Sequence, residues 1–130
     1  MDERAEAADP KRFAELRGTS VRRRAPGDAA EDVSVRAPGI VATHDHGLDA
    51  AAIVWAVGRG HDYVGGAGSK AKEARVKALL EERGVARETI DRVRMPVGLA
   101  IGGSTPEEIA LLIAAELVAW RHGRGPELML

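Results

Sequence analysis

The stretch "HDYVGGAGSKAKEARVKALLEERG", residues 61–84, combines the features that decide the fold. Its short apolar run at 62–65 predicts a buried strand, three glycines and a serine predict a turn, and the charged segment that follows predicts a helix. Ser69 suits the N-cap of this helix and Gly84 its end. The helical spacing places Val76, Leu79 and Leu80 inward and Lys72, Glu73, Lys77 and Glu81 toward water.

The glycine turn itself suggests a binding site. Glycine lets the backbone approach another group closely, and the start of a helix offers free N–H groups to an anion. Residues 65–70 therefore indicate a phosphate site in which Lys70 adds a positive charge. A closely packed turn without a ligand is the alternative.

The same alternation of strand and helix continues on both sides of this stretch. Residues 39–46, "GIVATHDH", predict a strand that ends in polar residues, and 48–58 predict a helix that closes at Gly58 or Gly60. Residues 87–93 predict one or two helical turns, and 95–104 a loop or short strand. Before them, 9–16 predict a short helix and 21–32 an exposed connection.

The segment 105–123, "TPEEIALLIAAELVAWRHG", gives the strongest helix signal. Thr105 is the expected N-cap, Pro106 the first helical residue and Glu108 the partner in a capping box. The apolar face contains Ile109, Leu112, Ile113, Leu117 and Trp120. Strands alternating with helices predict an α/β fold with a small, mostly parallel sheet of three strands.

Composition limits the classes of function. A chain of 130 residues suits one domain, and a net charge of −1 argues against a nucleic-acid partner. Without cysteine there is no disulfide, thiolate nucleophile or Cys-ligated metal. The longest apolar stretch, 109–120, is too short to span a membrane, and with no signal peptide we expect a cytoplasmic protein.

Two polar clusters, 43–46 and 65–70, follow the predicted strands, at the edge where open parallel sheets bind ligands. We expect His44 and Asp45 to hydrogen-bond a loop or ligand, and Asp49 to cap the next helix. A metal site at His44 and His46, completed by Asp45 or His61, is a weak alternative.

One carboxylate, Glu116, lies on the apolar face of the last predicted helix. A buried carboxylate needs hydrogen-bond partners, and we expect backbone N–H groups of residues 96–103 to supply them. A ligand or subunit contact is the alternative. No serine has a histidine within local reach, which argues against a hydrolase.

Three motifs, "ATHDHGLD", "YVGGAGSKAKEARVKALLEERG" and "MPVGLAIGGSTPEEIALLIAAELVA", resemble in order and spacing the C-terminal Rossmann-like domain of the XdhC/CoxI family, the xanthine dehydrogenase accessory proteins. The resemblance is dense over residues 40–121. The opening "DERAEAADPKRF" is similar to the segment after the second strand of that domain. The resemblance thus implies a single truncated domain, 1–130, of a three-layer fold that lacks its first β-α-β unit. Its parts are a partial leading segment and loop at 1–38, the matched core at 39–123 and a tail at 124–130.

The family implies a function as an accessory factor, not an enzyme. Its members bind the molybdenum cofactor (molybdopterin), support its sulfuration and insert it into molybdenum hydroxylases. The implied partners are therefore a xanthine dehydrogenase-like hydroxylase subunit and a cysteine desulfurase. The matching positions are Thr43, His44, Asp45, Gly65, Gly68, Ser69, Lys70, Gly98 and Gly102, together with the capping residues of the last helix.

The departures from the family limit what the chain is expected to do alone. The family's N-terminal domain, with its metal-associated cysteine, and its dinucleotide-type turn have no counterpart here. This leaves recognition of a phosphate or of a partner. An unpaired sheet edge predicts self-association, or a second chain that supplies the missing half. The alternatives are an NAD- or flavin-binding redox module, which would lack its glycine fingerprint, and an interaction remnant without a ligand.

Overall fold

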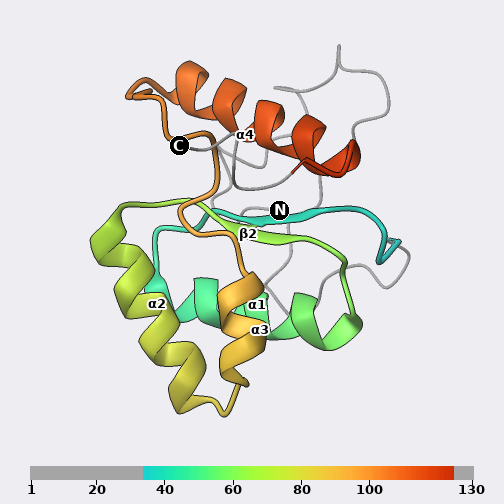
Figure 1. Ribbon diagram of the computed structural model, residues 1–130. Coiled ribbons are helices and arrows are strands. Elements are labelled where there is room, and N and C mark those ends of the chain that lie inside the picture. The colour runs from blue at the N-terminus through green and yellow to red at the C-terminus, as the bar shows by residue number, and fades with distance from the viewer. Residues whose placement is uncertain (1–33, 125–130) are drawn as a thin grey trace, which may run out of the picture.

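The computed structural model describes residues 34–124 (Figure 1). The predicted helix at 9–16, the connection at 21–32 and nearly all of the tail lie outside these residues. The elements are β1 (Gly39–Val41), α1 (His46–Arg59), β2 (Val64–Gly66), α2 (Lys70–Glu82), α3 (Arg87–Arg92) and α4 (Pro106–Arg121). The predicted alternation of strands and helices is confirmed.

The sheet is smaller than predicted. β1 and β2 pair in parallel, with Ile40 opposite Gly65. The expected third strand is reduced to a single parallel bridge between Gly65 and Arg94. Arg94 N–H donates to the Val64 carbonyl at 2.9 Å, but Pro96, two residues later, has no N–H with which to continue the ladder. The prediction of three strands was therefore wrong for the described residues, which contain a sheet of two.

The helices lie on both faces of the strands. Figure 1 shows α4 on one face and α1, α2 and α3 on the other. The core lies on the three-helix side and is almost entirely aliphatic. It contains Ala50, Ile53, Ala56, Val64, Val76, Leu80, Ile90, Val93 and Met95. Small and branched side chains allow the helices to approach the strands closely.

Local sequence sets the ends of the helices. Ser69 caps α2 by accepting from Lys72 N–H at 3.2 Å, and Gly84, with φ +78°, follows its end, as predicted. α1 begins earlier than predicted, at His46, because Asp45 caps it by accepting from Leu48 N–H at 2.9 Å. The prediction that Asp49 is this cap was wrong, since Asp49 lies inside the helix and is fully buried.

α4 begins with the predicted capping box. Glu108 N–H donates to the Thr105 hydroxyl at 3.1 Å, and the Glu108 carboxylate accepts from Thr105 N–H at 3.2 Å. Farther along α4, Leu111 and Val118 are 68% and 54% exposed, so this helix presents apolar groups away from the sheet as well as toward it. No helix among residues 34–124 has the length and apolar character needed to cross a bilayer.

Buried Glu116 joins α4 to the sheet. Its carboxylate accepts a hydrogen bond from the Tyr63 hydroxyl and is paired with Arg94 Nη2 at 3.1 Å. The prediction of backbone partners from residues 96–103 was therefore wrong: two distant side chains satisfy the carboxylate. Burial, followed by the neighbouring Glu116 carboxylate, raises the pKa of Tyr63, which keeps its hydroxyl protonated as a donor. The Tyr63 and Trp120 rings pack nearby, with centroids 5.3 Å apart.

Candidate functional site

Hydrogen bonds to the first turn of α1 fix the turn that follows β1. Thr43 N–H and its hydroxyl donate to the same Asp49 oxygen at 3.0 and 2.6 Å. The Thr43 hydroxyl also lies 2.9 Å from the Asp45 carbonyl. The hydrogen bonds of Thr43 therefore stabilise the turn. His44 and His46 are exposed on either side of Asp45.

Lys72 of α2 reaches into this turn from the neighbouring element. Its Nζ lies 2.6 Å from Asp49 Oδ2 and donates to the Thr43 carbonyl at 2.7 Å. The Lys72 side chain is only 14% exposed, so its predicted place among the water-facing residues was wrong. The ion pair joins the start of α1 to the start of α2.

The glycine turn divides into a buried and an exposed part. Gly65 lies within β2 and is buried, and an added Cβ would meet Val97 and Ile40 at 3.0 and 3.2 Å. Gly65 is therefore needed for close packing and is covered. Gly68, Ser69 and Lys70 are exposed at the start of α2.

The start of α2 is the part of this turn that could accept an anion. Ser69 accepts from Lys72 N–H, and Glu73 N–H makes the first bond within the helix. The N–H groups of Lys70 and Ala71 lie before that ladder and carry the positive end of the helix dipole. The Lys70 side chain, exposed beside them, adds a full charge.

The start of α1 is less suited to an anion than the start of α2, because the Asp45 carboxylate already accepts a hydrogen bond from its N–H groups. The N–H of Leu48, then that of Gly47, lowers the pKa of the Asp45 carboxyl, and His44 and His46 contribute to the same direction. Asp45 is thereby held as a carboxylate that points to its own helix. Of the two predicted polar clusters, 43–46 and 65–70, the second therefore offers an anionic ligand the more positive electrostatic potential.

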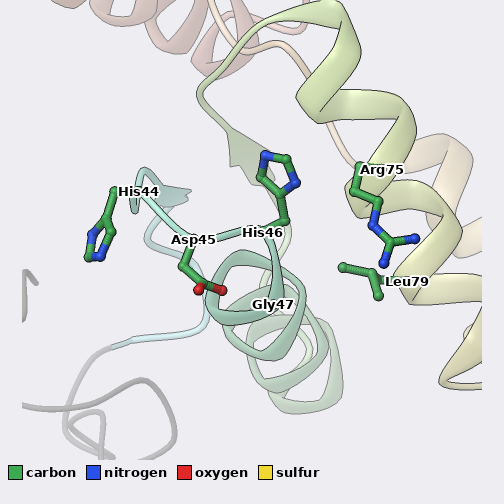
Figure 2. Close-up of a pocket in the computed structure, with 6 residues that line it drawn as sticks. All are labelled: His44, Asp45, His46, Gly47, Arg75 and Leu79. Atoms are coloured by element: carbon green, nitrogen blue, oxygen red, sulfur yellow. The ribbon is translucent and has the colours of Figure 1, made fainter.

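A shallow hollow lies between the start of α1 and the middle of α2 (Figure 2). Its volume is about 420 Å³, and it is lined by His44, Asp45, His46, Gly47, Arg75 and Leu79. His46, the first residue of α1, lies between His44 on one side and Arg75 of α2 on the other (Figure 2). The lining carries one carboxylate, Asp45, and three basic side chains, among which Arg75 is always charged, so Arg75 is the group that could pair with an anionic occupant.

Of the two predicted glycines before α4, Gly98 packs against that helix and Gly102 does not. Gly98, with φ +114°, packs where an added Cβ would lie 3.5 Å from Ile113. Gly102 has φ +90°, and an added Cβ there would meet nothing within 4 Å. Both glycines thus adopt the positive φ angles that the connection to α4 requires, and Gly98 also packs against α4.

The histidine-based metal site receives no support from the geometry. Within residues 34–124 no three His, Asp or Glu side chains come together as metal ligands. His61 lies elsewhere, with Nδ1 2.9 Å from the Ala37 carbonyl and its ring beside Trp55.

Sequence reasoning missed the Asp49–Lys72 pair, although the spacing contained a signal. Lys72 precedes buried Val76 and Leu80 by four and eight residues, so it shares their inward face. Asp49 likewise precedes buried Ile53 by four. Two opposite charges, each on the inward stripe of its helix, indicate a buried pair.

The sequence of the chain is similar to that of known proteins. The family model for the XdhC Rossmann domain matches residues 1–117. An uncharacterized protein of Escherichia coli (strain K12), YqeB, is 31% identical over 104 residues, which are 80% of this chain and 19% of the relative. The chain thus spans about a fifth of the length of this curated relative.

Proposed function

The chain belongs to the XdhC family through its Rossmann domain, and from this premise we propose that it is a cytoplasmic accessory factor that helps deliver molybdenum cofactor to a xanthine dehydrogenase-like hydroxylase. In this role it binds and hands over a cargo and has no turnover of its own. The cargo is an organic pterin that carries a phosphate group, so a domain can hold it without touching its metal.

The observation that carries the proposal is the exposed start of α2. Lys70 stands beside two backbone N–H groups that the helix leaves unused, at the edge where the chain leaves β1 and β2. The hollow lined by His46 and Arg75 lies between the start of α1 and the middle of α2, farther along the same helix than Lys70. We assign the phosphate to Lys70, Ser69 and Gly68, and the remainder of the cargo to the hollow.

The side chains present suit the phosphate group of the molybdenum cofactor better than its metal. The sequence has no cysteine, so it offers no thiolate to a soft metal centre. Sulfuration of the cargo would therefore not use a thiolate of these 130 residues, and a cysteine desulfurase is the proposed partner for that step.

An unpaired strand edge supports association with another chain. Gly39 N–H donates to Tyr63 and Val41 accepts from Ala67, so these two residues face β2. The backbone groups of Ile40, between them, point to the opposite side, where no described strand pairs. We propose that a second copy, or another chain that supplies a strand, pairs there, and that the hydroxylase subunit meets the same assembly.

Calorimetric titration with molybdopterin tests the proposal, with NAD as the comparison ligand. We expect saturable binding of molybdopterin that Lys70→Glu weakens strongly. Arg83→Glu is the matched control, because Arg83 is exposed at the other end of α2 and its substitution changes the net charge equally. Equal loss in both variants would reduce the effect to net charge, and preferential binding of NAD would replace the accessory function with a redox module.

A further inference from the structure

The strongest unexplained feature is an ion pair beneath the proposed site. Asp49 is fully buried, and its partner Lys72 comes from a different helix at 2.6 Å. Burying two charges costs hydration energy, which is recovered only when hydrogen bonds satisfy the remaining groups. Here Thr43 supplies them: it donates twice to Asp49 and accepts from Lys72.

The glycine turn gives Lys72 its path. Gly68 has φ +146°, and an added Cβ would lie 2.4 Å from Lys72 Cδ. A side chain at residue 68 would therefore displace the lysine stem that passes beside it. This accounts for one glycine of the turn without any ligand.

The geometry also separates the roles of two lysines in the same turn of helix. Lys70 is exposed, and no side chain within residues 34–124 pairs with it, whereas the Lys72 ammonium group contacts Asp49 and Thr43 and its side chain is 14% exposed. A ligand at the start of α2 can reach Lys70 without competing for Lys72.

We infer that Lys72 is the positioning residue of the site: it fixes the turn at residues 43–47 against the start of α2 and touches no ligand itself. This inference rests on the proposed function, because it assigns the support of the same site. Removal of the ammonium group should free the Thr43 carbonyl and loosen the turn that carries His46. The hollow and the α2 start would then no longer be held in one arrangement.

The test compares Lys72→Met with Lys77→Met in the full chain. Lys77 is the matched control because it lies on the same helix in an ion pair with Glu73 at 2.8 Å, away from the turn. Hydrogen exchange of the Thr43 amide is measured first. We expect faster exchange in Lys72→Met, a near-normal rate in Lys77→Met, and little change at the core amides of Ile53 and Val76.

Binding of inorganic pyrophosphate is then measured where every variant is folded. Loss of a supporting group should weaken it about fivefold to tenfold in Lys72→Met and less than about twofold in Lys77→Met. Asp49→Asn combined with Lys72→Met removes both buried charges. It should recover thermal stability without recovering affinity, which a merely stabilising pair would not do.

The outcomes separate this inference from the proposed function. Unchanged Thr43 exchange in Lys72→Met overturns the positioning role. So does wild-type affinity in Lys72→Met when Lys70→Glu has lost binding, and the proposed function then stands. If the wild-type chain does not bind pyrophosphate, the proposed site fails and the positioning role fails with it, and the exchange rate of Thr43 then shows only whether Lys72 fixes the turn at residues 43–47 against α2.

Discussion

Replacing Arg94 by methionine should selectively loosen α4, because it leaves the buried Glu116 carboxylate without its cation. Removing one member of a fully buried pair costs about 3–5 kcal/mol. The Arg94 side chain is 34% exposed and Tyr63 still donates to Glu116, so water and one hydrogen bond compensate in part. We therefore expect a loss of about 2 kcal/mol, or a fall in Tm of roughly 6–10 °C for a domain of this size.

Urea unfolding followed by fluorescence and circular dichroism measures this effect. In a Trp55→Phe background, the fluorescence reports Trp120 of α4 alone, since the chain has two tryptophans. We expect the Trp120 transition to move to lower urea than the circular dichroism transition, which would show that α4 separates first. Arg92→Met, at an exposed position on α3, is the control and should change the stability by less than about 0.5 kcal/mol.

The combined Arg94→Met, Glu116→Gln variant tests the cause. The carboxamide keeps an acceptor for Tyr63 and carries no charge, so about 1 kcal/mol should return. If Arg94→Met and Arg92→Met unfold alike, the ion pair does not hold α4, and the reasoning is refuted.

Three further results are expected. Gly68→Ala should lower the free energy of unfolding by about 1–3 kcal/mol in thermal melts, because the added Cβ displaces Lys72. Gly58→Ala is the control and should be neutral or stabilising, because an added Cβ there meets nothing within 4 Å. Equal effects of the two substitutions would contradict this account. The N–H groups of residues 104 and 105 lower the pKa of Glu108 from its ordinary 4.5, so its stabilisation is complete above about that pH and is lost as the pH falls through the folded-state pKa. Glu108→Gln should therefore flatten the acid limb of stability against pH, and an unchanged limb would count against the capping box. Light scattering should show concentration-dependent association that Ile40→Lys abolishes, and a wild-type monomer at every concentration would exclude pairing at that edge.

The features that the sequence predicted correctly are those set by neighbouring residues. The capping box of α4 and the Ser69 cap each depend on residues within one turn, so local pattern suffices to find them. Resemblance to a known family supplied the rest of the correct assignment.

The error at Glu116 concerns partners that only the folded chain brings together, whereas two other errors had a signal in the sequence. Glu116 is separated from Tyr63 by 53 residues and from Arg94 by 22, and no local rule specifies such a cluster. The third strand was overestimated because the ladder is interrupted at Pro96, a limit that the sequence did contain. The prediction that Lys72 faces water was also wrong, although the sequence held the signal: Lys72 lies four and eight residues before buried Val76 and Leu80, on the same inward face of the helix.

The contrast between Lys70 and Lys72 extends to their chemical reactivity. Acylating reagents attack an accessible amine, and Lys70 presents one to solvent, while the amine of Lys72 is enclosed between a carboxylate and a carbonyl. In a labelling experiment followed by mass spectrometry, two lysines that are nearly adjacent in the sequence should therefore report opposite extents of modification. A domain that opened at the start of α2 would erase that difference, so the ratio of the two labels is an internal gauge of whether this corner of the fold is closed.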